Sequence, residues 1–491
     1  MDEATESGRG RPEHPGQGRP AAWTPAPAYA RGRNTRPRVA RAPGPGRPVT
    51  AHLPSGRDEL LLCVAERPDG RLQEARGAGE SMPSRIMLSP DDIATLDLTD
   101  PRTHAEYDLS EVWRQLRKTR PFHWHPSVGG APGFWVVSRH ADVSEIYRDN
   151  KRFTSERGNV LTTLLMGGDS AAGMMAAVTD GPRHSDIRKI LLTAFSPRAL
   201  EGVVENIRQS TRALVAEAVA RGECDFARDV AADIPLTAIC DLMGVPAADR
   251  AKVLELTATA LGNDGAAQSP AAAWQARNDI LAYFGTLAEE RRANPGSDAV
   301  SVLATGTIEG EPLTIDEIVV NCYSLIIGGD ETSRMSMTGG VLALIEHPEQ
   351  WRALKSGEAD LATAVDEILR WTTPALHFGR TALEDVPVGT QGQVIKAGDI
   401  VTLWNDSANM DEEVFEAPER FRLDRTPNKH LSFGYGPHFC LGAYLGRAEI
   451  AAMLSALREL VASVELRGDT RRNYSNLLSG VTSLPVALRA E

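Results

Sequence analysis

Hydrophobic residues recur at helical spacing along most of the chain after residue 82. Within 109–119, for example, the apolar side chains fall on one face, as in an amphipathic helix that packs against a core. Strand signals are fewer, and the clearest is a hairpin over 122–139. The segments with helical spacing are 109–119, 142–149, 197–222, 226–243, 247–261, 274–292, 314–347 and 443–460, and a further helix begins after Pro182. This pattern predicts one continuous globular domain.

Residues 1–81 have neither helical nor strand spacing. They are rich in Pro, Gly, Ala and Arg and contain no lysine. Such a segment cannot bury enough apolar surface to offset the entropy lost on ordering. We therefore predict a disordered extension over 1–81 and one globular domain over 82–491, and we expect the natural start at Met82 or Met87. The first residues lack the basic and apolar regions of a signal peptide.

Composition narrows the class of protein. The formal net charge of -13 makes nucleic acid an unsuitable partner. Five scattered cysteines, an odd number, indicate a reducing compartment without a disulfide framework. No apolar run is long enough to cross a membrane. We expect a monomeric cytoplasmic protein.

A glycine-framed cysteine near the C-terminal end carries the first chemical signal. In the run 433–442, Gly434 and Gly436 can take positive φ angles and turn backbone amides toward Cys440. A helix is expected directly after this run, and its N-terminus favours an anion and lowers a thiol pKa. The sequence predicts a thiolate at Cys440.

A thiolate in such a loop can attack as a nucleophile or bind a soft metal. The nearest base, His438, is two residues away, where a ring nitrogen rarely reaches the sulfur. Zinc needs several protein ligands, and no second Cys or His lies at the required spacing. These points leave an iron whose other ligands come from a cofactor such as haem. The alternative is a buried free cysteine in a glycine-rich turn.

The run 433–442 resembles the haem-ligand signature of the cytochrome P-450 monooxygenases, soluble bacterial type. Two further stretches resemble motifs of that family in the same order, 328–332 its oxygen-activating motif and 367–370 its Glu-x-x-Arg motif. The resemblance covers roughly 82–491. It implies the cytochrome P-450 fold, mainly α with a small β region, and haem b held between the long central helix and the helix after Cys440, whose sulfur would be the axial ligand.

The long central helix contains two adjacent glycines, Gly328 and Gly329. Each costs about 1 kcal/mol relative to Ala, so a helix that keeps both is expected to approach something flat. The resemblance implies that Glu331 and Thr332 deliver protons during oxygen activation. Thr332 can also donate a hydrogen bond to the Gly328 carbonyl. The alternative role for Glu331 is a salt bridge to Arg334.

Candidate partners for the haem propionates form a second group. His184 and Arg188 are four residues apart and share one helical face, which suits a dianion. The alternative is a solvated surface pair. The resemblance adds Arg380 and His438 as propionate partners. The remaining expected haem contacts are Phe433, Gly434 and Gly328.

Glu367 and Arg370 share a helical face, a spacing that by itself is most often a surface salt bridge. The resemblance implies that they are structural and pair with an arginine before the Cys440 loop, for which we assign Arg420. The stretch 153–180 is long and lacks periodicity, and in the family this region covers the substrate. The expected substrate contacts are Leu161, Met174, Ile327, Ala375, Leu376, His377 and Phe378. For His377, orienting a polar substrate group and plain packing both remain open.

The resemblance implies insertion of one atom of dioxygen into an organic small molecule by hydroxylation or epoxidation. Electrons would come from NAD(P)H through a separate ferredoxin and ferredoxin reductase, and Arg183, Lys189 and Arg447 are candidates to dock the ferredoxin. A secondary metabolite such as a polyketide or peptide, free or on a carrier protein, is the expected substrate class. Three alternatives are kept. They are oxidative coupling or cyclisation, a peroxide-driven haem-thiolate enzyme, disfavoured by the acid and alcohol at 331–332, and a non-catalytic module that recruits carrier proteins, disfavoured by Cys440.

Overall fold

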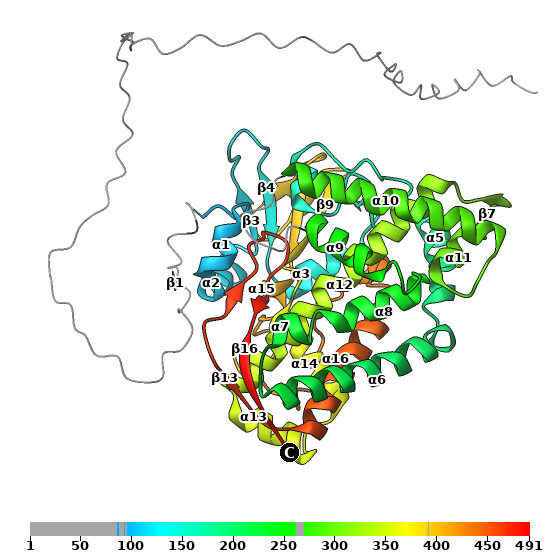
Figure 1. Cartoon of the computed structure of the whole chain (residues 1–491). Helices are drawn as coiled ribbons and strands as arrows, with labels where there is room; N and C mark the ends of the chain where they lie inside the picture. Colours follow the sequence, from blue (N-terminus) through cyan, green and yellow to red (C-terminus); the bar gives the residue numbers. More distant parts are fainter. Residues whose placement is uncertain (1–85, 88–92, 94–95, 262–269, 391) are drawn as a thin grey trace, which may run out of the picture. The chain divides into compact units, whose positions relative to one another are not determined.

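The computed structural model describes residues 86–87, 93, 96–261, 270–390 and 392–491. The predicted extension over 1–81 and the expected start at Met82 lie outside these residues, whereas the alternative start, Met87, lies within them. The fold is mainly α-helical with a small β region, as predicted (Figure 1). The helices are α1 Pro101–Glu106, α2 Ser110–Thr119, α3 His140–Arg148, α4 Leu161–Leu165, α5 Gly181–Ala194, α6 Pro197–Arg221, α7 Phe226–Asp229, α8 Asp233–Met243, α9 Arg250–Leu261, α10 Pro270–Ala293, α11 Ala299–Ala304, α12 Ile315–Glu346, α13 Pro348–Ser356, α14 Leu361–Thr372, α15 Asn405–Ala408 and α16 Ala443–Leu460.

The strands form one larger sheet and several small ones. They are β1 Ile86–Met87, β2 Tyr107–Asp108, β3 Phe122–His125, β4 Phe134–Val137, β5 Phe153–Thr154, β6 Glu223–Asp225, β7 Thr307–Ile308, β8 Glu311–Pro312, β9 His377–Ala382, β10 Val386–Val388, β11 Gln393–Ile395, β12 Ile400–Trp404, β13 Val461–Leu466, β14 Arg471–Arg472, β15 Val481–Ser483 and β16 Pro485–Ala490. The larger sheet has the order β3-β4-β12-β9-β5, with β12 parallel to β4 and antiparallel to β9. A second sheet has the order β13-β16-β6.

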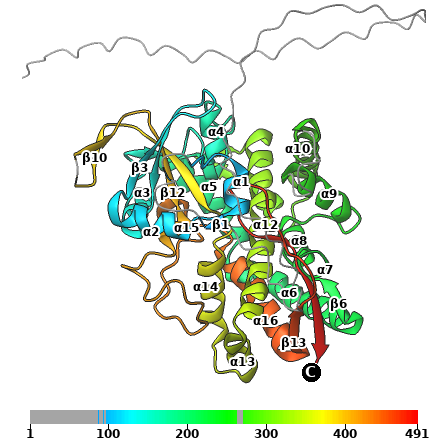
Figure 2. The ribbon, with the colours of Figure 1, turned by 90° about the vertical axis from the view of Figure 1, so that its left-hand side faces the viewer.

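Helix α12 runs through the core. Thr314 and Glu317 form a capping box at its start, each side chain accepting from the other's backbone amide. Ile318, Cys322 and Ile326, spaced four apart, have no exposed surface. At about 1.5 Å per residue the helix is roughly 48 Å long, and α8, α10, α14 and α16 pack against it (Figure 2). Helix α12 carries the motif at 328–332, and α16, which packs against it, directly follows the Cys440 loop.

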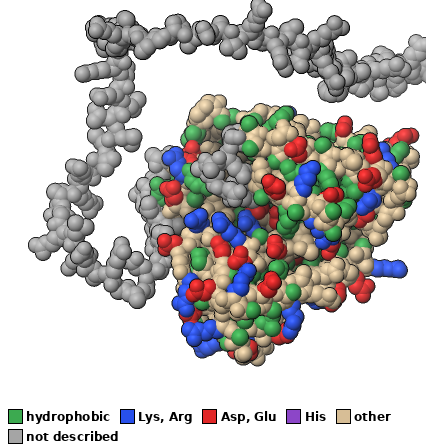
Figure 3. All heavy atoms as spheres, viewed as in Figure 1, with side chains coloured by type: hydrophobic (Ala, Val, Ile, Leu, Met, Phe, Trp, Pro, Cys, Tyr) green, Lys and Arg blue, Asp and Glu red, His purple; other side chains and the backbone are tan. Residues whose placement is uncertain are grey.

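Most predicted segments form as expected, with one difference. The helix predicted over 226–243 is two helices, because α7 ends at Asp229 and its capping residue, Val230, leaves the helical conformation with φ -132°. Ser196 caps α6 by accepting from the Ala199 amide. Among the described residues, no helix is long and apolar enough to cross a membrane. On the face drawn in Figure 3, acidic and basic side chains are interspersed.

Candidate active site

The loop that carries Cys440 is built on its glycines. Gly434 and Gly436 have φ angles of 65° and 72°, in the left-handed region that favours glycine. A Cβ on Gly436 would lie 2.5 Å from the carbonyl oxygen of Tyr147, so α3 can approach the loop only if this residue is glycine. The Cys440 amide donates to the Phe433 carbonyl over 2.9 Å and closes the loop. The backbone thus fixes the position of the sulfur.

The thiol of Cys440 is held just before α16, whose capping residue is Gly442. The residue retains exposed surface, while enough protein atoms surround its sulfur to desolvate it. Burial raises the pKa of the Cys440 thiol, and the Gly442 amide, Arg188 and Arg447 only partly oppose that effect. The predicted lowering of this pKa is therefore wrong for the protein alone. Coordination of a metal would remove the proton outright.

The adjacent glycines of α12 face different surroundings. Gly328 is exposed, and a Cβ there would meet nothing within 4 Å. A Cβ on Gly329 would lie 3.1 Å from a methyl group of Ile239 on α8. Only Gly328 therefore presents a bare backbone to open space, whereas Gly329 serves close helix packing. Thr332 Oγ1 donates to the Gly328 carbonyl over 3.0 Å, as predicted.

Two carboxyls follow the glycines, and both are buried. Glu331 is 3% exposed and forms an ion pair with Arg334, the contact kept as its alternative role. Burial raises the pKa of Glu331, and the paired guanidinium opposes the rise. The pKa of Asp330 is raised to about 7, mainly by burial and to a smaller extent by the negative charge of the neighbouring Glu331. The helix therefore holds two carboxyls with increased proton affinity one turn or less from Thr332.

Two arginines and two histidines, Arg188, Arg380, His184 and His438, form a group next to the Cys440 loop. Arg380 is buried and donates to the Gly379 carbonyl over 2.7 Å, and Arg188 donates to the Phe439 carbonyl over 2.7 Å. Burial lowers the pKa of both guanidinium groups. Within the described residues neither guanidinium has a carboxylate in ion-pair contact. Desolvated cations left in this way fit a dianionic ligand, as the two propionates of haem would be.

The two histidines of the group are not equivalent. The centroids of their rings lie 4.3 Å apart. Burial, and to a smaller extent the charge of His438, lower the pKa of His184 to about 4, so the His184 ring is neutral at neutral pH. His438 Nε2 lies 2.9 Å from Asp180 Oδ1. Burial alone would raise the pKa of Asp180, but hydrogen bonds from His438, Thr154 and the Ser155 amide lower it to about 2. His438 therefore commits one nitrogen to Asp180, a residue that sequence analysis missed although it immediately precedes the helix of His184.

The buried carboxylate of Glu367 anchors the segment that precedes the Cys440 loop. Arg370 donates to it through Nε and Nη2, both over 2.8 Å, and both side chains are 0% exposed. The further arginine is Arg425, whose Nε donates over 3.0 Å. The assignment of Arg420 is wrong, because its side chain is exposed and only its carbonyl takes part, accepting from Arg425 over 2.7 Å. The path of the chain between these two arginines decides which one points inward.

A second acidic partner lies beside Glu367. Asp366 accepts from Arg447 Nε over 2.9 Å and lies 3.3 Å from His430 Nε2. The Arg447 guanidinium stacks over the ring of Phe433, 4.6 Å from its centroid. This arrangement ties α14, α16 and the Cys440 loop together. Sequence analysis missed Asp366 and His430, since their spacing to Arg447 has no local pattern.

The residues predicted to contact substrate fall into two sets. Met174, Ile327 and Phe378 are half-buried and keep accessible side-chain surface. Leu161 and His377 are 0% exposed, so their assignment as substrate contacts is wrong. His377 Nε2 lies 3.0 Å from the Asn476 carbonyl, its ring packs 4.5 Å from Trp404, and burial lowers its pKa to about 3. These observations support the packing role for His377.

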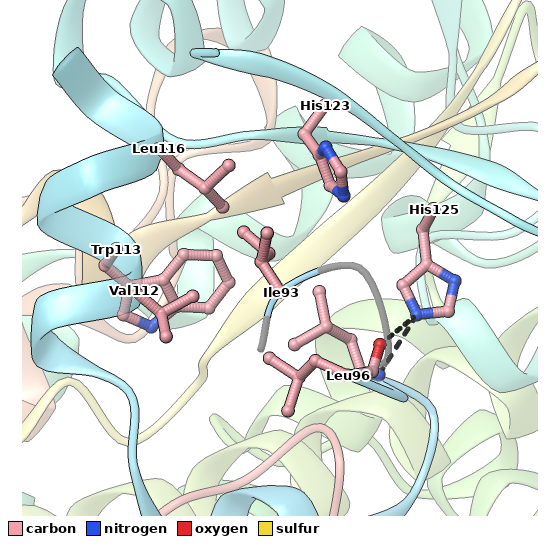
Figure 4. Close-up of a pocket in the computed structure, with 8 residues that line it drawn as sticks. Ile93, Leu96, Val112, Trp113, Leu116, His123 and His125 are labelled. Atoms are coloured by element: carbon pink, nitrogen blue, oxygen red, sulfur yellow. Dashed lines mark hydrogen bonds between the residues drawn. The ribbon is translucent and has the colours of Figure 1, made fainter. Parts of the chain in front are cut away.

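The apolar cluster around Trp404 explains the burial of several predicted contacts. Leu161 and Leu376 belong to this cluster, and Leu376 and Ala375 are each 5% exposed. One side of the cluster is the pocket in Figure 4, where His125 Nε2 contacts the backbone of Leu96 and Leu98. The pocket is lined by Ile93, Leu96, Leu98, Val112, Trp113, Leu116, His123 and His125. None of the predicted site residues lines it.

These features meet the requirements of a haem-thiolate oxygenase. The Cys440 sulfur can bind a soft metal, the desolvated arginines next to its loop can bind an anionic cofactor, and α12 presents an acid and an alcohol after the exposed Gly328. Comparison with known proteins agrees. The model of the family described as Cytochrome P450 matches residues 361–469. The chain is 51% identical over 407 residues to "Cytochrome P450 NovI" of Streptomyces niveus, which covers 83% of this chain and 100% of the relative.

Two more distant relatives support the same family. The chain is 36% identical over 402 residues to a "Steroid C26-monooxygenase" of Rhodococcus jostii (strain RHA1), covering 79% of this chain and 84% of the relative. The solved structure of P450 OxyD, "involved in the Biosynthesis of Vancomycin-type Antibiotics", matches with a TM-score of 0.73 at 33% identity, covering 81% of this chain and 100% of that chain. The chain belongs to the cytochrome P450 family and is a monooxygenase, an oxidoreductase that incorporates oxygen into a small-molecule substrate. The family binds haem through a cysteine thiolate.

Proposed function

We propose that this monooxygenase hydroxylates or epoxidises a secondary metabolite, such as a polyketide or a peptide, presented free or on a carrier protein. The observation that carries this substrate class is the likeness to OxyD, whose description names the biosynthesis of vancomycin-type antibiotics. The 51% identity to NovI supports the family alone. The more distant steroid enzyme shows that other members of the family act on other small molecules.

In this proposal the haem would be held by residues of several elements. Cys440 would provide the sulfur ligand, and Arg188, Arg380 and His184 would bind the propionates, with the second ring nitrogen of His438 as a further contact. The bare backbone at Gly328 would let a flat group approach α12. When bound, haem binds dioxygen and, with electrons from a separate ferredoxin and reductase fed by NAD(P)H, activates it for insertion.

Protons are supplied by the residues after Gly328. The Thr332 hydroxyl donates to the Gly328 carbonyl in the resting protein, so its own lone pairs remain available to accept from a proton carrier. Glu331 acquires a proton more readily than an ordinary glutamate, since burial raises its pKa. To pass that proton on, Glu331 must leave Arg334, and rotation of this one side chain is the step we assign to it.

The electron donor docks near the Cys440 side of the molecule in this proposal. Two of the predicted docking residues already have partners, because Arg183 pairs with Glu317 and Arg447 pairs with Asp366. Lys189 is exposed and forms no ion pair with any residue that the structure describes. Arg198, on the next helix, is also exposed and lines an open pocket between α6 and α16, together with Pro197, Glu201, Val204, Arg208 and Tyr444. We therefore assign Lys189 and Arg198 as the main cationic contacts for an acidic ferredoxin.

The test begins with purified, haem-loaded protein and a panel of polyketides, peptides and carrier-bound amino acids. A true substrate displaces water from the iron and shifts the haem absorption. Turnover of that compound under heavy-isotope dioxygen should place one heavy oxygen atom in the product. A product that carries no label from dioxygen contradicts oxygen insertion, and shifts obtained only with compounds outside these classes contradict the proposed substrate class.

A further inference from the structure

Asn321 of α12 has a buried amide that joins two separate parts of the chain. The residue is 2% exposed. Its Nδ2 donates to the Met174 carbonyl over 2.8 Å, and its Oδ1 accepts from the Ala176 amide over 2.9 Å. The second N–H of Nδ2 donates to the Glu317 carbonyl on its own helix over 2.7 Å. One side chain therefore binds the backbone on both sides of Met175 and uses both of its donor hydrogens.

Local sequence does not account for this amide. Asn is a weak helix former, and burying an amide is costly unless its hydrogen bonds are made. An apolar residue would suit the interior of α12 better if packing alone mattered. The hydrogen bonds to the segment 174–176 offset the cost of burying the amide. We therefore assign the amide the role of holding this segment.

The segment that Asn321 holds has little regular structure of its own. It lies between α4, which ends at Leu165, and α5, which begins at Gly181. Gly167, Gly168 and Gly173 all have positive φ angles just before it. The helical turn over 176–178 is short. A backbone of this kind has many accessible conformations, and a clamp from a rigid helix restricts them.

Helix geometry places the clamp on the same face of α12 as the proposed oxygen site. Gly328 is seven residues after Asn321 and Thr332 is eleven after it, which at 3.6 residues per turn brings all three to nearly the same face of α12. Along the axis, Asn321 is about 10 Å from Gly328. The segment bound to Asn321 therefore covers the same face of the helix that presents Gly328 and Thr332.

We propose that Asn321 is a positioning residue that fixes the segment 174–176 on α12 and so sets the size and shape of substrate that reaches Gly328. This inference rests on the proposed function of that face of the helix. Met174 and Met175 are half-buried there, and their unbranched side chains can pack against differently shaped apolar ligands once their backbone is fixed. Asn321 does not take part in the chemistry itself.

Two variants separate the clamp from the stability of the helix. Asn321→Leu removes all three hydrogen bonds at similar volume. Asn321→Thr retains a donor for the Glu317 carbonyl, four residues back, but cannot reach both sides of Met175. The matched control is Thr338→Val, since Thr338 is also fully buried in α12 and its hydroxyl donates only within the helix, to the Arg334 carbonyl over 2.9 Å.

The first readout is hydrogen exchange of the amides in 174–178, measured with and without haem. Loss of the clamp should speed this exchange about tenfold in both Asn321 variants, because a buried hydrogen bond contributes on that order to local opening. The control should leave it unchanged. Unchanged exchange in the Asn321 variants overturns the inference, whether or not the protein binds haem.

The second readout is shape selection, probed with imidazole and the bulkier phenylimidazole as iron ligands. The ratio of their dissociation constants should change at least about threefold in the Asn321 variants and stay constant in the control. Faster exchange with an unchanged ratio would make Asn321 a purely structural residue and overturn its role in selection. Failure of the wild type to bind either azole would instead contradict the proposed function, while the exchange result would still decide whether the amide holds the segment.

Discussion

At the scale of single residues, the site combines groups whose neighbours shift their proton affinity in opposite directions. Asp180 is stabilised as a carboxylate by three donors, whereas Asp330 and Glu331 are buried and have raised pKa values. His184 and His377 are both kept neutral, mainly by burial. The carboxyls of α12 next to Thr332 therefore bind a proton more readily than ordinary carboxyls, whereas Asp180 beside the Cys440 loop stays ionised.

Replacing Thr332 by Val tests the hydroxyl. The variant keeps the volume of the side chain but loses the donor to the Gly328 carbonyl and the acceptor for an incoming proton. We expect product formation to fall by about a hundredfold while NAD(P)H consumption continues, since general acid catalysis contributes on this order. The measurement is the ratio of product to NAD(P)H consumed, with Thr338→Val as control. An unchanged ratio would remove Thr332 from the proposed proton path.

Glu449 of α16 gives a prediction about stability and pH. It is 1% exposed, and burial raises its pKa to about 8, so in the folded protein it stays protonated far above the ordinary glutamate value of 4.5. Between these values the unfolded chain has lost this proton and the folded chain has kept it, so Glu449 makes stability fall as pH rises. We expect Glu449→Gln to remove a slope on the order of 1.4 kcal/mol per pH unit. Denaturant midpoints of both proteins across this range measure it, and parallel curves would contradict the assignment.

At the scale of elements, α12 and the loop before α16 are shaped by their contacts more than by local preference. In α12, Gly329 allows close packing against Ile239 of α8, whereas Gly328 leaves the backbone next to it uncovered. The loop depends on glycines at 434 and 436 and on the carboxylate of Glu367, which accepts from Arg370, Arg425, Asn428 and the Arg422 amide. Both elements thus hold a backbone in a conformation that a ligand can approach.

A comparison of two arginines tests the support of the loop. Arg425→Ala removes a buried partner of Glu367 and leaves its charge partly uncompensated, so we expect a loss of about 3 kcal/mol in the free energy of unfolding and reduced haem content. Arg420→Ala changes an exposed side chain and should cost less than about 0.5 kcal/mol. Denaturant unfolding and haem absorbance measure both. Equal losses in the two variants would show that the assignment of Arg425 is wrong.

Sequence patterns were reliable where the determinants are local. The bond from Thr332 to the Gly328 carbonyl joins residues that are four apart in the sequence, and it is present. Arg425 was missed because the path of a loop selects it over Arg420. Leu161 was misassigned because it packs into the apolar cluster around Trp404. Its apolar character alone does not show whether it faces that cluster or a substrate.

At the scale of the whole molecule, the helical core and the sheet meet around the proposed haem site, and the surface outside it must admit an electron donor. Lys189 and Arg198 are exposed on α5 and α6, while Arg183 and Arg447 have carboxylate partners. The overall charge of -13 opposes the approach of an acidic ferredoxin, so docking requires a local group of cations.

Charge reversal at this surface tests the docking proposal. Lys189→Glu should slow reduction by ferredoxin several-fold at low salt, with no effect on reduction by dithionite, which needs no docking. The difference between wild type and variant should shrink as the ionic strength approaches about 0.5 M, where surface charges are screened. Stopped-flow reduction measures both rates. A wild-type rate that rises with salt would place the docking contacts elsewhere.

The central claim is that the sulfur of Cys440 binds iron, and the spectrum of the reduced carbon-monoxide complex tests it most directly. The wild type should bind haem and give the absorption of a sulfur-ligated iron, and Cys440→His should give that of a nitrogen-ligated iron. Wild-type protein that carries no haem, or whose complex has the nitrogen-ligated spectrum, would contradict the account.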